Sequence, residues 1–248
     1  MEDPYETIEY RGFNINIHTD IDPLDPIDNH HWFGTMITWH RNYSLGHEQP
    51  KRDPDEFLQD LAINADQSLQ DVILYWEELP HSKYAEKQIK TSIQRRIDKH
   101  YIILPLYLYD HSGITMRTSP FSCPWDSGQV GFIYVSNDKV KKEFNRKRMS
   151  KKLKQKAIDL MIGEVNTYDQ YLTGEIFGYM IEPTDKNKSI NCDDSCWGFY
   201  GYDHEKSGLL EMSKDAINCA IKSYKEECKQ NHQRQMQMNQ FMQSCWAF

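Results

Sequence analysis

Apolar and polar positions alternate near the start of the chain, which predicts strands. In residues 13–18 (FNINIH) every second side chain is apolar, and this period is typical of a half-buried strand. Residues 7–10 predict a neighbouring strand across Arg11-Gly12, and the β-branched and aromatic run 34–40 predicts a third. Residues 20–29 contain two prolines together with Asp and Asn, so we expect a loop without a helix there.

A helical period replaces the alternation after residue 50. Asp53, Pro54 and Glu56 form a helix start, with Asp53 as the N-cap, Pro54 at the first position and Glu56 at the third. The apolar positions that follow have the spacing of one helix face; they are Phe57, Leu61, Ala65, Leu69, Val72, Ile73 and Trp76. We expect this helix to end at Pro80, and a polar helix to follow to about residue 99.

The middle of the chain contains the strongest strand signal. Residues 101–109 are almost continuously apolar or aromatic, and Pro105 within them predicts an edge position or a bulge, because proline cannot donate to a ladder. Residues 114–117 and 130–135 predict two further strands that complete a meander. A long helix, basic at first and with an apolar face in its later half, is then expected over residues 138–171.

The C-terminal third predicts strands over residues 175–181 and 196–201, and a helix over residues 209–228. All these elements together indicate an α+β protein, an antiparallel meander sheet packed by two or three long helices. The expected organisation is an N-terminal β and loop segment, a main α+β domain and a Gln- and Met-rich tail. These three parts are residues 1–50, 51–228 and 229–248.

Composition narrows the class of protein further. No run of about 18 apolar residues occurs, so no membrane span is expected. The acidic start of the chain, MEDP, lacks the apolar run of a signal peptide. The cysteines are too sparse for a disulfide scaffold, which favours a reducing cytoplasm; they stand at positions 123, 192, 196, 219, 228 and 245.

Charge is distributed unevenly, although the net charge is −8. Residues 1–60 hold thirteen acidic side chains and four basic ones, whereas residues 139–156 hold ten basic side chains and only Glu143 as an acid. The basic block predicts a nucleic-acid footprint, a patch for an acidic protein or simply a solvated helix face. The acidic segment could instead imitate phosphate charge. The candidate basic patch consists of Lys141, Lys142, Arg146, Lys147, Arg148, Lys151 and Lys152.

Chemically versatile side chains are densest in residues 120–131 (PFSCPWDSGQVG). This turn between strands combines a thiol, a carboxylate, a hydroxyl and an indole, and functional residues are common on such loops. Cys123 with His111 would supply a nucleophile and a base. The alternative is a structural corner, with Trp125 buried and Gly128 at positive φ. The candidate binding residues are His111, Ser112, Cys123, Trp125, Asp126, Ser127, Gln129 and Trp197.

No metal or cofactor is expected from the sequence. The acidic loop around Asp20 lacks the Gly and the closing Glu of an EF-hand. Cys192, Cys196 and His204 lack a fourth ligand at zinc-site spacing. His30-His31 stands outside the helical framework of a metalloprotease motif, and no Gly-rich phosphate loop occurs.

The C-terminal tail is a candidate interaction segment. Methionine-rich surfaces adapt to partners, and the final Trp246-Ala247-Phe248 is unfavourable in water. Self-association and docking on the chain's own domain are equally compatible with this pattern.

Several stretches resemble a family of small proteins encoded by bacteriophages, prophages and plasmids. The resemblance covers the chain from about Phe13 to Ala220. It rests on residues 34–46 (GTMITWHRNYSLG), 108–113 (LYDHSG), 120–135 (PFSCPWDSGQVGFIYV) and 194–201 (DSCWGFYG). It implies a mobile-element accessory protein in the cytoplasm of a bacterial host, and it transfers no catalytic residues. Accessory proteins of this kind often block a host defence complex by binding it.

Three functions follow as hypotheses. The first is a protein that binds and inhibits a host defence complex, with the possibility of a homo-oligomer. The second is an enzyme acting on nucleic acid or nucleotides through His111, Cys123 and Asp126. The third, which the acidic net charge disfavours, is a nucleic-acid-binding protein that uses the basic patch.

Overall fold

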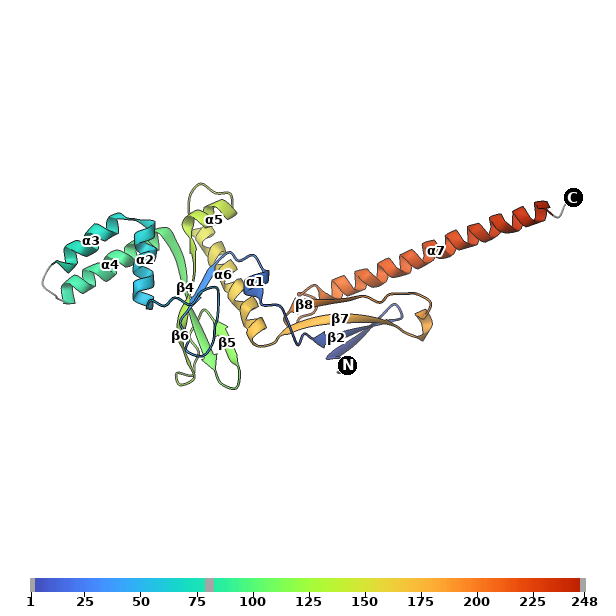
Figure 1. Ribbon diagram of the computed structural model, residues 1–248, viewed down its shortest axis with the longest axis horizontal. Helices are drawn as coiled ribbons and strands as arrows, with labels where there is room; N and C mark the ends of the chain where they lie inside the picture. The colour runs from blue at the N-terminus through green and yellow to red at the C-terminus, as the bar shows by residue number, and fades with distance from the viewer. Residues whose placement is uncertain (1–2, 79–82, 246–248) are drawn as a thin grey trace. The chain divides into compact units, whose positions relative to one another are not determined.

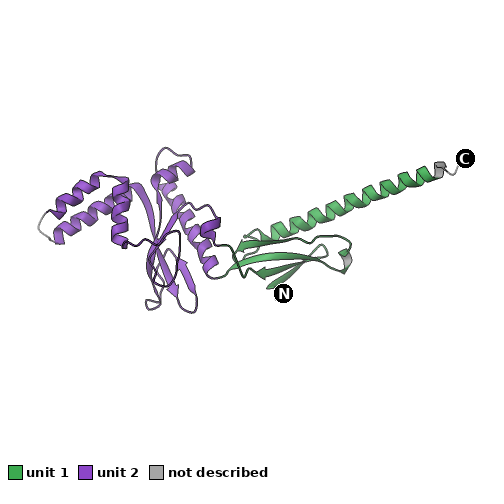
Figure 2. Cartoon of the chain, viewed as in Figure 1, with its two compact units in different colours: residues 1–24, 174–248 green, residues 25–173 purple. Residues whose placement is uncertain are grey.

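The computed structural model describes residues 3–78 and 83–245 of the 248-residue chain. The chain forms two compact units, which Figure 2 shows in different colours. Unit 2 is one continuous segment, Asp25–Thr173, whereas unit 1 joins the chain before residue 25 to the chain from Gly174 onwards. This division differs from the expected boundaries after residues 50 and 228, because the second strand, which pairs with the first, also pairs with a strand near residue 180.

In the described residues, unit 1 has an antiparallel sheet of four strands in the order β1-β2-β7-β8 and a long helix, α7 (Figure 1). Its elements are β1 (Glu6–Tyr10), β2 (Phe13–Thr19), β7 (Ile176–Pro183), η1 (Asp185–Asn187), β8 (Ser195–Tyr200) and α7 (Leu209–Cys245). Arg11 and Gly12 connect β1 to β2 with φ angles of +50° and +78°. These left-handed conformations are typical of a two-residue hairpin turn.

The alternation predicted for β2 is confirmed by its burial. Phe13, Ile15 and Ile17 are fully buried, and they belong to one core with Leu209 and Ile217 of α7. The beginning of α7 therefore contributes to the core of this sheet, and the hydrophobic effect stabilises the pairing of segments that are far apart in sequence.

α7 is longer than the predicted helix. The expected helix ended at residue 228, but α7 continues to Cys245 and so includes the described part of the expected tail. Trp246 and the two residues after it lie outside the described residues. Within the described part of the chain, no helix is long and apolar enough to cross a membrane.

Unit 2 is built around a second antiparallel sheet, with strand order β3-β6-β4-β5. Its strands are β3 (Thr35–Thr38), β4 (Tyr101–Asp110), β5 (Ile114–Arg117) and β6 (Ser127–Ser136). Its helices are α1 (Pro26–Asn29), α2 (Pro54–Ala65), α3 (Ser68–Glu77), α4 (Lys83–His100), α5 (Asn137–Glu143) and α6 (Lys151–Leu172).

Apolar side chains from this sheet belong to separate cores. Met36, Leu106 and Ile133 share a core with α6, whereas Ile37 packs with Phe57 of α2. The two four-stranded antiparallel sheets and their helices confirm the α+β class.

The expected meander is wrong in its strand order. β4 lies between β5 and β6, so β6 pairs with the first strand of the three and not with the second. The expectation of an edge position or a bulge at Pro105 is met in part, since β4 is an internal strand of the sheet. β5 pairs with β4 only from Tyr107 onwards, so Pro105 has strand pairing with β6 alone, and the register shifts between Leu106 and Tyr107.

The first predicted long helix is divided in two. The helix start at Asp53 is confirmed, since its side chain accepts a hydrogen bond from the Glu56 N–H. The helix then breaks at Asp66, where φ is −150° and the carboxylate accepts hydrogen bonds from the N–H and hydroxyl of Ser68. Such local side-chain bonds compete with helix continuation. Pro80, the expected helix end, lies outside the described residues.

The second predicted long helix is also divided, into α5 and α6. Asn145 has φ of +50° in the connecting loop, a conformation that Asn tolerates better than most residues. Ser150 then caps α6 by accepting a hydrogen bond from the Leu153 N–H. The basic block therefore spans a helix end, a loop and a helix start.

The expectation of no helix in residues 20–29 is wrong for α1. Pro26 stands at the first helical position, where proline is tolerated because its missing N–H would have no partner within the helix. Asp25 caps this short helix by accepting a hydrogen bond from the Ile27 N–H at 2.8 Å.

Candidate functional site

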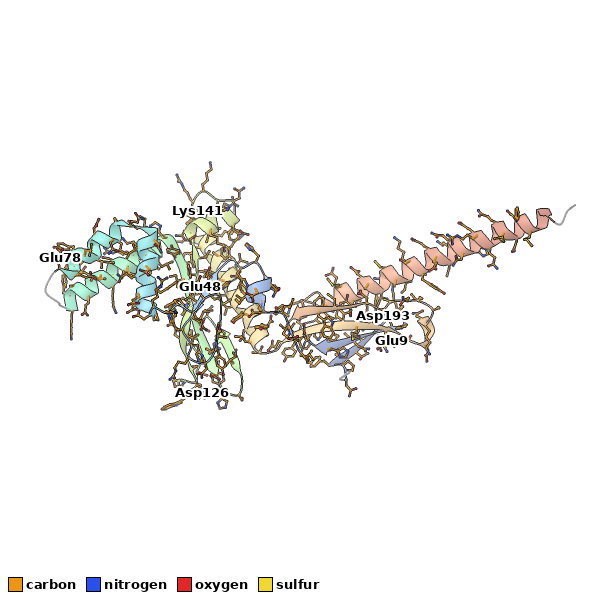
Figure 3. All side chains as sticks on the ribbon, viewed as in Figure 1. Glu9, Glu48, Glu78, Asp126, Lys141 and Asp193 are labelled. Carbon is orange, nitrogen blue, oxygen red and sulfur yellow. The ribbon has the colours of Figure 1, made fainter. Side chains whose placement is uncertain are left out.

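The turn 111–113 and the loop 118–126 meet at one end of the sheet in unit 2. They do so because the ends of β4, β5 and β6 lie side by side there. The N–H of Asp110 donates to the carbonyl oxygen of Asp126 at 2.8 Å and joins the two segments. Figure 3 labels Asp126 at this end of unit 2. We call these two segments the tip.

Trp125 is the most exposed large apolar side chain of the tip. Its side chain is 92% exposed, which corrects the alternative of a structural corner with a buried indole. Gly128 also differs from that alternative, since it is not among the glycines with positive φ. The loop therefore presents the indole outwards and does not use it as core.

Ring stacking and hydrogen bonds hold the loop in place behind Trp125. The Arg117 guanidinium lies over the Phe121 ring, 3.8 Å from its centroid, and donates to the carbonyl oxygens of Ser119 and Pro120. Phe121 also packs against Tyr109, with 5.6 Å between the ring centroids. These contacts hold the loop through two of its backbone carbonyl groups and through the ring of Phe121.

Asp126 contacts both of the other residues predicted as catalytic candidates. Its Oδ2 lies 3.4 Å from Nδ1 of His111 and 3.7 Å from Sγ of Cys123. Each of these contacts connects Asp126 to a neighbouring part of the tip. The hydroxyl of Ser127 donates to the carbonyl oxygen of Cys123, which closes the loop at the start of β6.

This order of contacts differs from that of a nucleophile and base. A thiol is activated when an imidazole accepts its proton, with a carboxylate orienting the imidazole from its far side. Here the carboxylate of Asp126 is the group that both the Cys123 thiol and the His111 imidazole contact. The contacts connect the turn to the loop and stabilise the tip.

The remaining candidate binding residues have different environments. Ser112 has φ of +54° and its hydroxyl donates to the carbonyl oxygen of His111. Gln129 is exposed and donates to the carbonyl oxygen of Gly131 at 3.4 Å. Ser112 belongs to the tip and Gln129 borders it, so the structure brings seven of the eight candidates together.

The eighth candidate, Trp197, belongs to unit 1. Its indole lies on Gly178, where an added Cβ would be 2.3 Å from the ring. It also lies near His18, with 6.4 Å between ring centroids. Trp197 thus packs beside the irregular pairing of β7 with β8, and it is also 45% exposed.

The candidate basic patch lies on α5, the loop after it and the start of α6. Lys141 pairs with Asp138 at 2.6 Å, whereas the other six members are exposed and form no ion pair in the part of the chain that the structure describes. Figure 3 labels Lys141 at the end of unit 2 opposite Asp126. The patch and the tip are therefore separate surfaces of this unit.

Glu164 is a polar residue that the sequence reasoning missed. Its carboxylate accepts hydrogen bonds from the N–H groups of Phe33 and Gly34, and burial raises its pKa although these bonds act in the opposite direction. It lines an open pocket of about 340 Å³. The sequence signal that could have identified Glu164 is its position three residues after buried Met161, on the packed face of α6. The pocket is lined by His30, His31, Trp32, Asp159, Leu160, Gly163, Glu164 and Thr167.

Metal ligation has no support in the described residues, which contain no group of three or more His, Cys, Asp or Glu side chains placed to hold an ion. No protein-family model, curated protein or solved structure matches the chain. The resemblance to the mobile-element family therefore stays a prediction.

Proposed function

We propose that this protein acts by binding another protein, with Trp125 as the central contact. The observation that carries the proposal is an indole that is 92% exposed at the end of a well-connected loop. Tryptophan is enriched among residues that contribute most to binding at protein interfaces. Its indole offers a large apolar area and an N–H donor, so one side chain can supply both affinity and orientation.

The connections behind Trp125 support this role energetically. Ordering a loop at an interface reduces affinity, and a loop that is already ordered avoids much of that cost. Arg117, Phe121 and Asp126 supply the connections in the free protein. The expected partner surface has an apolar pocket for the indole, and polar groups around it that can face Asp110 and His111, both exposed.

On the resemblance alone, we propose that this partner belongs to a bacterial defence complex and that the protein inhibits it in the host cytoplasm. Stoichiometric binding would be sufficient for such inhibition. This identification of the partner is a proposal separate from the assignment of Trp125, and the two are tested separately.

The test compares Trp125→Ala with the matched variant Tyr75→Ala, which removes an exposed ring from α3, far along the chain from the tip. Proteins captured from host lysate by the unmodified chain are identified, and the affinity of the purified partner is measured by calorimetry. Truncating a residue of this kind at an interface is expected to weaken binding about thirtyfold or more. Tyr75→Ala is expected to bind as the unmodified chain does. Undiminished binding by Trp125→Ala would overturn the proposal.

A second candidate is an enzyme acting on nucleic acid or nucleotides. It rests on the proximity of His111, Cys123 and Asp126, although their contacts do not follow the order of a nucleophile and base. Cys123→Ala and His111→Ala separate the two candidates when partner binding and host protection from phage are both measured. Loss of protection with intact binding would support the enzyme. Protection that follows binding in every variant would support stoichiometric inhibition.

A further inference from the structure

The pocket beside Glu164 lies between α6 and the segment that follows α1. Figure 1 shows α1 beside α6, and residues of the two elements contact each other. The volume of the pocket, about 340 Å³, falls within the range of about 300–1,000 Å³ that is usual for small-molecule sites. Residues 30–32 form one wall, and α6 residues between 159 and 167 form the other. None of these residues belongs to the tip, so the pocket is a separate feature of unit 2.

Glu164 connects the two walls of the pocket. One of its carboxylate oxygens accepts a hydrogen bond from the Phe33 N–H, and the other accepts one from the Gly34 N–H. A carboxylate oxygen has two lone pairs, so each oxygen can accept a second hydrogen bond from a molecule in the pocket. The backbone contacts therefore fix the orientation of the carboxylate without using all of its acceptor capacity.

The surroundings of Glu164 disfavour its negative charge. Burial raises the pKa of this carboxyl group, although the two backbone hydrogen bonds and the nearby Lys139 and His31 act in the opposite direction. The amine of Lys139 already donates to the carbonyl oxygen of Trp32 at 2.9 Å. A further cation in contact with Glu164 would stabilise the ionised carboxylate.

Two other residues of α6 determine the chemistry of the pocket. Asp159 is exposed and supplies a second carboxylate, whose Oδ1 accepts a hydrogen bond from the side chain of Gln155 at 2.9 Å. Leu160, which is 45% exposed, adds apolar surface, and Trp32 lines the same pocket. The pocket thus combines two carboxylates with apolar surface.

Gly163 lies in the middle of α6, where glycine is less favourable than alanine. It is not among the glycines with positive φ. Beyond its chain neighbours and the helix backbone, an added Cβ would meet nothing within 4 Å. Neither the backbone conformation nor the packing therefore requires a glycine here. Because Gly163 lines the pocket, an added methyl group would take up space that a bound molecule can use.

We propose that this pocket binds a small organic amine, whose ammonium group is held by Asp159 and Glu164 and whose apolar part lies against Leu160. An ammonium group has three donors and no acceptor, which matches the lone pairs of the two carboxylates. Hydrogen bonds between ionised groups are stronger than those between neutral groups. Contact of the apolar part with Leu160 adds the hydrophobic effect, and the two carboxylates disfavour an anion of the same size.

The first experiment uses phenethylamine as the probe. Its matched control is 2-phenylethanol, which has a hydroxyl group in place of the ammonium group. NMR titrations of the isotope-labelled full chain measure both dissociation constants. Phenethylamine is expected to bind about tenfold more tightly or better, because only the ammonium group forms charge-assisted hydrogen bonds. Equal dissociation constants for the two compounds would overturn the proposal.

The second experiment measures phenethylamine binding by variants of the pocket. Asp159→Asn keeps the size of the side chain but removes its charge, and it is expected to weaken binding about tenfold. Asp71→Asn makes the same change at an exposed position of α3, and it is expected to bind as the unmodified chain does. Equal weakening by both variants would show an effect of net charge and would overturn the proposal.

Gly163→Ala tests the space in the pocket without changing any charge. It is expected to raise the melting temperature, because alanine favours the helix, and to weaken phenethylamine binding about threefold or more, because the methyl group reduces the room for the ligand. A glycine without a role in binding would give the higher melting temperature alone. Unchanged binding by either Gly163→Ala or Asp159→Asn would overturn the proposal.

Discussion

The tip of unit 2 and residues 225–242 of α7 both expose apolar side chains, but the contacts that order the two regions differ. At the tip, Trp125 stands on a loop held by Arg117 and Asp126. In residues 225–242 of α7, Met238 and Met242 stand on a stretch of helix whose side chains are exposed. The tip is ordered by contacts within unit 2, whereas the side chains of residues 225–242 are exposed along the helix.

The largest expected difference between the two regions is in amide hydrogen exchange. Amides of residues 225–242 are expected to exchange near the unfolded rate, because fraying there requires almost no free energy. Amides of β4 and β6, which pair with each other over most of their length, are expected to exchange more slowly by orders of magnitude. Mass spectrometry of the labelled peptides measures both.

The first half of α7, which packs in the core of unit 1, provides the control for this measurement. Its amides are expected to exchange more slowly than those of residues 225–242. Strong protection of residues 225–242 would contradict the difference drawn between the two regions.

The second prediction concerns the anchoring of β5, which leads into the tip. Asp169 of α6 accepts hydrogen bonds from the Met116 N–H at 2.6 Å and from the Thr115 hydroxyl at 2.7 Å. Asp169→Ala leaves these donors without their partner and is expected to lower the free energy of unfolding by about 1–3 kcal/mol. Urea denaturation measures the loss, and Asp169→Asn, which keeps an acceptor oxygen, is expected to restore part of it. Equal losses in both variants would contradict this role.

Local sequence patterns predicted most of the elements because their signals are short-range. The alternation in β2 and the capping pattern at Asp53 depend only on neighbouring residues, and both are confirmed. Strand order and unit boundaries depend on pairings far apart in sequence. Nothing in residues 13–19 indicates that they pair with residues 177–183, and this pairing decides which parts of the chain form unit 1.

The sequence predicted which residues form the candidate site but not how their side chains are arranged. The density of functional groups near Cys123 and the turn at His111 correctly located residues that the structure brings together. Sequence could not show that Asp126 contacts both, nor that Trp125 faces solvent, because the orientation of a loop side chain depends on tertiary packing. Glu164 was missed since its partners, the N–H groups of Phe33 and Gly34, are about 130 residues away.

The third prediction concerns the pH dependence of the free energy of unfolding, which arises from a histidine packed in unit 2. Burial, and then the charge of Lys139, lower the pKa of His47 below its ordinary value of 6.5. In the folded protein its Nδ1 accepts a hydrogen bond from the Met36 N–H at 3.0 Å, which requires an unprotonated nitrogen. The unfolded chain therefore takes up the proton first as the pH falls.

The free energy of unfolding is accordingly expected to fall as the pH is lowered through 6.5, and to level off below the folded pKa. Thermal melts between neutral and mildly acidic pH measure this change. His47→Gln, which retains an acceptor for Met36 and does not titrate, is expected to show a shallower dependence. Parallel pH profiles for the two proteins would show that His47 is not the group responsible.

The smallest effect is expected for the free energy of unfolding of the Trp125→Ala variant. This prediction tests directly whether the indole lies outside the core. Because the indole is 92% exposed, its removal should change the free energy of unfolding by no more than about 0.5 kcal/mol, as for most surface positions. Trp32→Ala is the control: that indole is 8% exposed and donates to the carbonyl oxygen of Pro26, so a loss of about 3–5 kcal/mol is expected. Chemical denaturation compares the two. If Trp125→Ala were as destabilising as Trp32→Ala, the indole would contribute to the core, and its exposure would no longer argue for a binding role.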